Sequence, residues 1–160
     1  MMINLKTGIF IKQPEGIEII PSISEKDFKS LAFEKDRFGD YRYQVDYVRH
    51  RDVLYSFTTI DDDGNPFHVR IVFSANNVEN WMYHISSFSL ENEQVSGSFP
   101  DFRERLSKTK EWHDNWMKKN CGSSPIASYW WGTIESSMSE KGEGSYIFLK
   151  FSKDVYEKNG

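Results

Sequence analysis

Large apolar residues alternate with polar ones through the middle of the chain. Alternation with a period of two places the apolar side chains on one face of a half-buried β-strand. Four segments show this spacing, and their apolar positions are Tyr41, Tyr43, Val45 and Tyr47, then Val53, Tyr55 and Phe57, then Phe67, Val69, Ile71 and Phe73, and then Trp81, Tyr83 and Ile85. Because parallel neighbours would need long crossovers, the short connections between these segments predict an antiparallel meander.

Apolar segments towards the two ends of the chain predict two further hairpins. Near the N-terminus, residues 9–11 and 17–20 flank a turn at residues 13–16, which contains proline and glycine, as type I turns prefer. Near the C-terminus, residues 129–134 and 146–151 are rich in aromatic and apolar side chains, and a loop containing two glycines joins them.

Two segments carry the signals of helices. A start at Ser24 that is close to a capping box predicts a short helix over residues 25–34. A second, longer helix should begin near Asp101 and stop at Gly122, with acidic residues in its first turn and lysines in its last. Residues at helical spacing form one stripe along this second helix, which we expect to lie on the sheet. The stripe consists of Phe102, Leu106, Thr109, His113, Trp116 and Met117.

Together these elements predict an α+β fold with an antiparallel sheet of about six to eight strands, one long helix and one short helix. No internal repeat, low-complexity tract or linker interrupts the chain, so residues 1–160 are expected to form a single domain. We expect residues 3–151 to form its ordered core and residues 152–160 a polar tail.

The composition of the chain indicates that it folds, and it also indicates in which cellular compartment the protein is found. The 160 residues suffice to bury a sizeable core, and the 16% aromatic content supplies large apolar surfaces. No apolar run approaches the roughly 20 residues of a membrane-spanning helix, and the N-terminus lacks the pattern of a secretory signal. Cys121 is the only cysteine, so no internal disulfide can form. We therefore expect a cytoplasmic protein that has no membrane partner.

The residues that catalysis or cofactor binding requires do not occur in a recognisable pattern. The chain has no GxSxG elbow, no phosphate-binding glycine loop, no GxGxxG turn and no HExxH pair. Cys121 falls at the C-terminal end of the predicted long helix, where the helix dipole opposes formation of a thiolate. We therefore expect no enzymatic activity, no cofactor and no metal. The net charge of −4 also argues against nucleic acid as a partner.

Three consecutive aspartates lie between two of the predicted strands. Their spacing begins like a calcium-binding loop, but Pro66 replaces the required glycine and Val72 replaces the bidentate glutamate. A polar hairpin turn is the favoured interpretation, since Asp-Gly supplies a turn conformation. The alternative is an acidic contact loop, in which Asp61, Asp62 and Asp63 attract a basic partner.

Trp130 and Trp131 are adjacent in a predicted strand. Adjacent strand residues face opposite sides of a sheet, so both faces would carry a large aromatic ring at the same level. One indole can join the core, whereas the other is either covered by further structure or exposed as a recognition surface. Because tryptophan is enriched at binding hot spots, Trp130 and Trp131 complete the set of predicted partner-binding residues.

His113 lies at the centre of the apolar stripe of the long helix, where a neutral imidazole must find hydrogen-bond partners. A satisfied core histidine is the favoured interpretation. The alternative is a ligand pocket between the helix and the sheet, lined by Tyr83, His113 and Trp116. His68 and Arg70 share the second face of their strand, which we expect to be solvated.

Several of these features occur together in the C-terminal third. A helix carrying His113 and Trp116 is followed by the segment 129–136, a glycine-containing loop and the segment 145–149. This arrangement resembles small uncharacterised bacterial proteins of the immunity type, which are encoded beside polymorphic or contact-dependent toxins. The resemblance implies a protein-binding module that neutralises a cognate toxin by stoichiometric binding, with a basic toxin domain as its partner. The alternative function is a small-molecule-binding protein or an enzyme that acts at the pocket between the long helix and the sheet.

Overall fold

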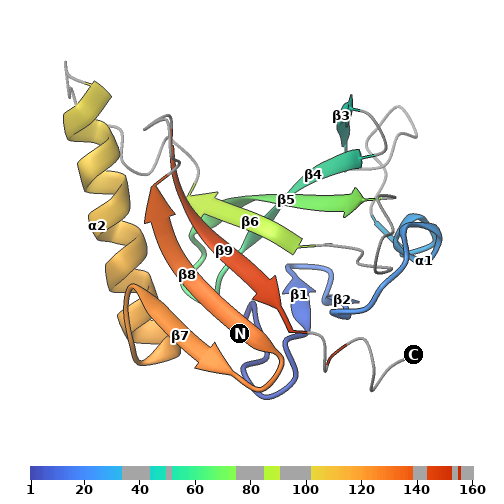
Figure 1. Ribbon diagram of the computed structural model, residues 1–160, viewed down its shortest axis with the longest axis horizontal. Helices are drawn as coiled ribbons and strands as arrows, with labels where there is room; N and C mark the ends of the chain where they lie inside the picture. Colours follow the sequence, from blue (N-terminus) through green and yellow to red (C-terminus); the bar gives the residue numbers. More distant parts are fainter. Residues whose placement is uncertain are drawn as a thin grey trace.

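The computed structural model describes residues 1–33, 44–49, 52–74, 85–90, 102–138, 144–152 and 155 (Figure 1). Within these residues the chain forms a seven-stranded antiparallel sheet, a two-stranded antiparallel sheet, one long helix and one short helix. The predicted α+β fold is therefore confirmed. Four of the predicted strand positions lie outside the described residues, and these are Tyr41, Tyr43, Trp81 and Tyr83.

The first half of the large sheet is a meander of four strands. These are β3 (Gln44–Arg49), β4 (Asp52–Ile60), β5 (Pro66–Ser74) and β6 (Ile85–Leu90). Each pairs antiparallel with the next, as the alternating segments predict.

The second half of the sheet runs back towards the first. After the long helix, β7 (Ile126–Tyr129) forms the far edge, and β8 (Gly132–Met138) and β9 (Ser145–Phe151) follow inwards from it. β9 pairs with β6 through Phe88 and Ile147, which closes the order β3-β4-β5-β6-β9-β8-β7. The predicted C-terminal hairpin corresponds to β8 and β9, whereas β7 has no counterpart among the predicted strands.

The long helix α2 (Phe102–Cys121) begins and ends where its signals place it. Gly122 follows it in the left-handed region, with a φ of 78°, and its N–H donates to the carbonyl of Lys118 at 3.2 Å, which ends the helix. The helix packs on β6, β8 and β9. The join of the two halves of the sheet therefore lies under α2.

The predicted apolar stripe of α2 is largely the face that packs on the sheet. Its buried members are His113, Trp116 and Met117. Leu106 and Thr109, nearer the start of the helix, are half-buried, and the side chain of Phe102 lies outside the described part of the chain.

The N-terminal segment forms the predicted hairpin from β1 (Phe10–Lys12) and β2 (Ile17–Ile19). The ring of Phe10 lies 6.4 Å from that of Phe57 on β4 and 6.0 Å from that of Phe88 on β6. The hairpin therefore covers the centre of the sheet.

The short helix α1 (Glu25–Lys29) is shorter than predicted. It starts as expected, because Ser24 Oγ accepts a hydrogen bond from the N–H of Asp27 at 3.0 Å. It ends after little more than one turn, where the chain folds back and brings the ring of Phe33 to 5.3 Å from that of Phe28. Packing of these two rings into the core therefore overrides the local preference for a longer helix.

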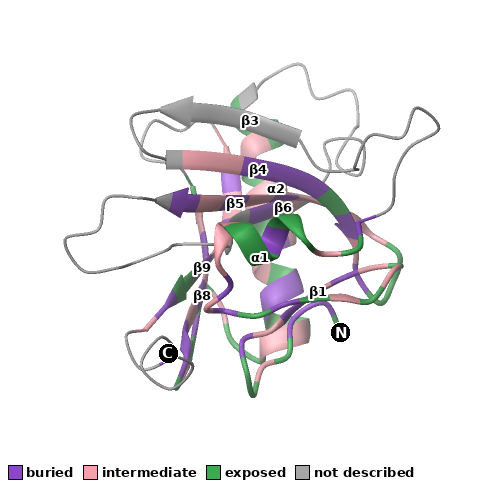
Figure 2. Ribbon diagram, turned by 90° about the vertical axis from the view of Figure 1, so that its right-hand side faces the viewer, coloured by how far each residue is buried: buried purple, intermediate pink, exposed green. Residues whose placement is uncertain are grey.

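One face of the large sheet carries the core. Figure 2 shows the strands as a curved layer, with α1, α2 and β1 on its inner side. Phe57 on β4 is paired with Val69 on β5, and the odd-numbered residues of these two strands point to the inner side of the sheet. The buried hydrophobic residues of the sheet are Tyr55, Phe57, Phe67, Val69, Ile71, Phe73, Phe88, Ala127, Ile134, Ile147, Leu149 and Phe151.

The C-terminal region departs from prediction at two points. The strand predicted over residues 129–134 is interrupted, because Trp130 and Trp131 form the turn between the paired strands β7 and β8. Gly132 follows with a φ of 149°, and a Cβ there would lie 1.9 Å from the carbonyl oxygen of Lys150, so only glycine allows this approach of β9. Val155, in the segment predicted to be a polar tail, is 0% exposed and belongs to the core.

Candidate functional site

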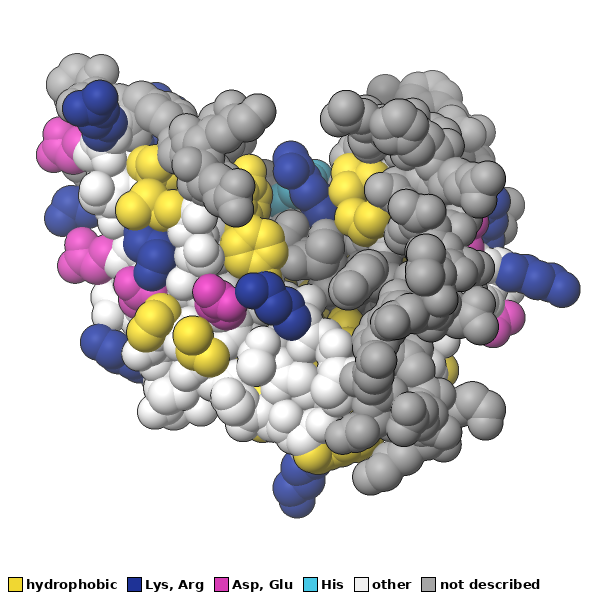
Figure 3. Space-filling view, viewed as in Figure 1, with side chains coloured by type: hydrophobic (Ala, Val, Ile, Leu, Met, Phe, Trp, Pro, Cys, Tyr) yellow, Lys and Arg dark blue, Asp and Glu magenta, His cyan; other side chains and the backbone are white. Residues whose placement is uncertain are grey.

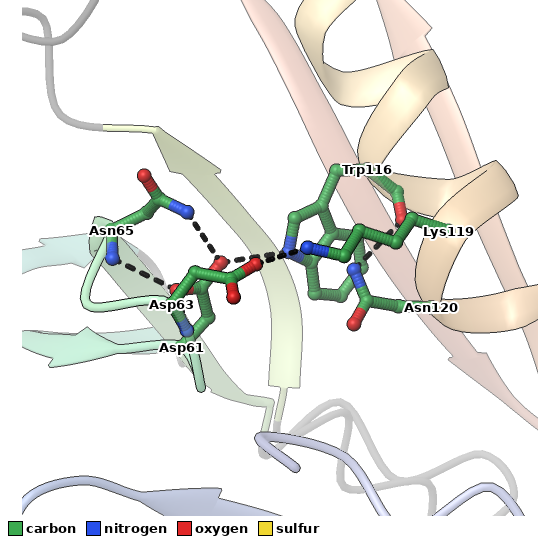
Figure 4. A network of polar contacts seen from close by, with 6 residues as sticks. All are labelled: Asp61, Asp63, Asn65, Trp116, Lys119 and Asn120. Carbon is green, nitrogen blue, oxygen red and sulfur yellow. Dashed lines mark hydrogen bonds and ion pairs between the residues drawn. The ribbon is translucent and has the colours of Figure 1, made fainter.

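The three aspartates follow β4, and the first of them holds the turn to β5 together (Figure 4). Asp61 is only 7% exposed. Its Oδ1 accepts hydrogen bonds from the backbone N–H groups of Asp63 at 3.0 Å and Asn65 at 2.8 Å, and its Oδ2 accepts one from the side-chain amide of Asn65 at 2.9 Å. Aspartate commonly stabilises turns in this way. The favoured interpretation as a polar hairpin turn is therefore confirmed.

Asp61 also joins this turn to α2. The indole Nε1–H of Trp116 donates to Asp61 Oδ2 at 3.2 Å (Figure 4). Burying a carboxylate is costly unless hydrogen bonds replace its hydration, and here four donors do so. The carboxylate of Asp61 is thus used inside the protein, which removes Asp61 from the predicted partner-binding residues.

The other two aspartates project from the turn. The side chains of Asp62 and Asp63 are 61% and 56% exposed. Asp62 forms an ion pair of 2.9 Å with the amino group of Met1, and Asp63 pairs with the Nζ of Lys119 in the last turn of α2. The hydrogen bond to Asp63 raises the pKa of Lys119. The turn therefore presents two carboxylates at the surface, each beside one cation of the same chain.

A pocket of about 240 Å³ lies between this turn and α2. Its lining residues are Asp63, Asn65, Trp112, Asn115, Trp116 and Lys119. The ring of Phe67 holds both indoles in place, since its centroid is 5.7 Å from Trp112 and 5.7 Å from Trp116. The pocket therefore combines an aromatic wall with a carboxylate, two amides and an ammonium group.

The two adjacent tryptophans have different roles. Trp131 is 0% exposed, its Nε1–H donates to the carbonyl of Leu5 at 2.9 Å, and its ring stacks on that of Tyr129 at 5.1 Å with an interplanar angle of 3°. Trp130 is 48% exposed, and its Nε1–H donates to the carbonyl of Lys6 at 2.6 Å. Trp131 is thus a core residue, contrary to its predicted place at the interface, whereas Trp130 remains a surface residue with a fixed orientation.

The acidic turn and Trp130 border the same N-terminal segment. The amino group of Met1 pairs with Asp62, and the carbonyl of Lys6 accepts from Trp130. Residues 1–6 span at most about 22 Å when fully extended, which limits the distance between the two anchoring points. We refer to Asp62, Asp63 and Trp130 as the contact triad.

No protein family model, curated protein or solved structure matches this chain. The similarity to immunity-type proteins therefore stays a prediction.

His113 is a buried residue of the core. It is 0% exposed, and its Nδ1 shares a hydrogen bond of 2.9 Å with Ser145 Oγ. Burial, which is the largest cause, and the nearby charge of Lys110 lower the pKa of His113 to about 4, although the charge of Asp114 opposes them. The imidazole is thus neutral at neutral pH, and the favoured interpretation as a satisfied core histidine is confirmed.

The ligand pocket predicted around His113 does not coincide with the pocket found beside α2. Trp116 lines the observed pocket, but His113 does not, and Tyr83 lies outside the described residues. The Ser145 hydroxyl and the His113 imidazole resemble the pair used in nucleophilic catalysis. Their exposures of 5% and 0% instead identify a hydrogen bond within the core.

The described residues lack the features of a reactive thiol, a metal site and a membrane-spanning helix. Burial raises the pKa of the half-buried Cys121 thiol, which keeps it protonated and poorly reactive. Within the described ranges, no three or more His, Cys, Asp or Glu side chains come together as metal ligands would. No described helix has the length and apolar character needed to span a membrane.

The outer face of the sheet, which carries His68 and Arg70, is less exposed to solvent than the sequence predicts. The guanidinium of Arg70 lies 5.7 Å from the centre of the Tyr146 ring, which lies 5.8 Å from that of Phe148, and His68 is half-buried. Figure 3 shows acidic and basic side chains interspersed over β8 and β9 and a hollow beside them. The described residues of this face therefore form no continuous basic surface of the kind that nucleic acid would favour.

Sequence reasoning identified Trp116 and the aspartates but missed Trp112, Asn115 and Lys119. A local signal for all three exists, because Trp112, Asn115, Trp116 and Lys119 are spaced i, i+3, i+4 and i+7 and must share a helix face. That this face meets the β4–β5 turn follows only from the packing of α2 on the sheet.

Proposed function

We propose that this chain is a protein-binding module that acts by stoichiometric binding to a basic protein partner, as an immunity-type protein does towards its cognate toxin. The observation that carries the proposal is the contact triad, in which Asp62, one of two exposed carboxylates on one turn, and the half-exposed Trp130 both contact the N-terminal segment. This segment brings the two kinds of predicted contact residue together.

The dimensions of the contact triad suit a single interface. A standard protein–protein interface covers about 800 Å² on each partner, a patch roughly 30 Å across. The anchors of Asp62 and Trp130, which are the Met1 amino group and the Lys6 carbonyl, are at most about 22 Å apart. One partner surface can therefore reach both.

Preorganisation favours binding by these residues. The Asp61 carboxylate fixes the turn that presents Asp62 and Asp63, and the hydrogen bond to Lys6 fixes the Trp130 indole. Groups that are already held in one orientation lose less conformational entropy when a partner binds. The carboxylates suit the steering of a basic surface, and the indole suits the role of a desolvated anchor.

The alternative function at a small-molecule site has less support. Pockets for small molecules usually occupy about 300–1,000 Å³, and the pocket beside α2 has only about 240 Å³. The proposal also places the protein in the cytoplasm, where a lone half-buried thiol such as Cys121 stays reduced.

Co-purification from the native host, followed by titration calorimetry with each retained protein, tests the proposal. We expect a one-to-one complex that the triple variant Asp62→Asn, Asp63→Asn, Trp130→Ala fails to form. A matched control replaces Glu104, Glu111 and Ile126, which are also exposed, with Gln, Gln and Ala. The proposal is wrong if the control and the triple variant bind equally, or if the chain retains a metabolite and no protein.

A further inference from the structure

We propose that the pocket between the β4–β5 turn and α2 receives an arginine side chain of the protein partner, with its guanidinium paired to Asp63 and stacked on Trp112. This inference rests on the proposed protein-binding function and names the chemical group that the partner would insert. Its basis is the composition, charge and size of the pocket.

The aromatic wall suits a planar cation. Trp112 is half-buried and so offers part of its ring to the pocket, and Phe67 at 5.7 Å supports it from the core. Trp116 is held from the same side by Phe67 and by Phe88 at 5.4 Å. Cations, and guanidinium most often, are attracted to the face of an indole, and Trp112 is the more exposed of the two rings.

The charge of the pocket also suits a cation. Asp63 lies at its rim, and Asp61 lies directly behind Trp116, with 3.2 Å between Asp61 Oδ2 and the indole nitrogen. Asn65 and Asn115 add amide groups, whose oxygens can accept from the remaining N–H groups of a guanidinium.

Lys119 shows that the rim of the pocket holds a cation. Its ammonium group is paired with Asp63 although both side chains are largely exposed, at 66% and 56%. Ion pairs in such exposed positions are weak and screened by salt, so another cation can replace the lysine. A guanidinium would form two parallel hydrogen bonds with the carboxylate and would stack on Trp112 as well.

The volume of the pocket suits a single side chain of a partner better than a free small molecule. A volume of about 240 Å³ is below the usual range for small-molecule pockets, and the site is open to solvent beside the contact triad. A single long side chain that enters from a docked surface fits this space, and Asp63 of the triad lines it.

The test follows the indole N–H signals of Trp112 and Trp116 by two-dimensional NMR during titration with N-acetyl-arginine amide. We expect saturable shifts at these two indoles, with a dissociation constant in the millimolar range, and none at Trp130. N-acetyl-citrulline amide, which has the same shape without the charge, should cause none. Equal shifts with the citrulline compound, equal affinity for N-acetyl-lysine amide, or no shifts with the arginine compound would each overturn the inference.

Two charge variants should change the affinity for N-acetyl-arginine amide in opposite directions. Asp63→Asn should weaken binding of N-acetyl-arginine amide about tenfold, because it removes a charge-assisted hydrogen bond. Lys119→Met should tighten it severalfold, because it removes the internal competitor for Asp63. Lys118→Met is the matched control, since Lys118 carries the same charge in the same turn but does not line the pocket, and it should change little. Weaker binding in Lys119→Met would contradict the inference.

The outcomes separate this inference from the proposed function. If a protein partner binds through the contact triad but N-acetyl-arginine amide shifts neither indole, the inference about the pocket fails alone. If the arginine compound binds as expected but no protein partner is retained, the proposed function fails and a guanidinium site remains.

Discussion

The indole of Trp116 donates a hydrogen bond to the carboxylate of Asp61 across 55 positions of the chain. This contact joins the last turns of α2 to the β4–β5 turn. It explains how the side chains around it keep a fixed arrangement at the surface, since both ends of the contact are buried.

Asp61→Ala should destabilise the protein by about 3 kcal/mol in a urea titration. The substitution leaves the N–H groups of Asp63 and Asn65 and the indole N–H of Trp116 without their acceptor, and each such loss costs about 1–3 kcal/mol where water cannot replace it. Asp62→Ala is the matched control, because this exposed neighbour should change stability by no more than about 0.5 kcal/mol. Similar losses in both variants would show that Asp61 does not hold the turn.

Trp116→Ala should cost about 3–5 kcal/mol in the same measurement, because the side chain is only 7% exposed and lies among aromatic rings. Trp130→Ala provides the comparison, since Trp130 is 48% exposed and should cost less than about 2 kcal/mol. Equal costs for the two variants would contradict the assignment of one tryptophan to the core and the other to the surface.

Local chemistry predicts much of the fold. Alternation in residues 53–57 and 67–73 identifies β4 and β5, the Ser24 cap starts α1, and Gly122 stops α2 where the sequence signals place it. Each of these features depends on neighbours within a few positions, so sequence reasoning can find it.

Tertiary contacts decide the rest and leave no local signal. Trp130 and Trp131 belong to an aromatic segment that favours a strand, but they form a turn, and Lys150 lies close to Gly132 directly after it. The candidate site likewise requires Asp61 and Trp116 to meet across the sheet. The sequence therefore could not predict the burial of Asp61, nor which of the two adjacent indoles, Trp130 or Trp131, joins the core.

Stability should fall between pH 6.5 and pH 4 because of His113. The unfolded imidazole binds a proton near pH 6.5, whereas burial lowers the pKa in the folded protein to about 4. Between these values the unfolded state binds more protons, so the free energy of unfolding decreases as the pH falls, by about 3 kcal/mol over the whole range. His113→Gln should lose this dependence in urea titrations at pH 7, 6, 5 and 4.

The contribution of Asp114 should be separate from that of His113. Partial burial opposes the shift, but hydrogen bonds from Lys110 at 2.6 Å and from Ser124 at 3.2 Å lower the pKa of Asp114 below 3.8. Its stabilising effect is therefore present above that value and is lost only at lower pH. An unchanged pH dependence above pH 4 in the His113→Gln variant would show that the histidine is not the group responsible.

The thiol of Cys121 should react slowly and be dispensable. Burial raises its pKa, so little thiolate is present at pH 8, and a disulfide-exchange reagent should modify the folded protein more slowly than the protein in urea. Cys121→Ser should fold and bind any partner as the parent does. Loss of binding in a folded Cys121→Ser protein would show that the thiol has a role in function.

The two parts of the contact triad should affect different steps of partner binding. Asp62→Asn should slow association and reduce its dependence on salt, because an exposed charge outside the pocket steers a basic partner before contact. Trp130→Ala should leave association nearly unchanged but accelerate dissociation, with a loss of about 2 kcal/mol in affinity, because a desolvated indole contributes once the surfaces have met. Both effects are measured by surface plasmon resonance at several salt concentrations, on a partner identified by co-purification.

Ile126→Ala is the control, since Ile126 is as exposed as Trp130, at 50%, but is not part of the triad. Charge steering changes the association rate of the partner, whereas burial of the indole changes its dissociation rate. The partner therefore does not dock on the triad in the way proposed if it dissociates at the same rate from Trp130→Ala and Ile126→Ala, or if the aspartate variant alters only dissociation.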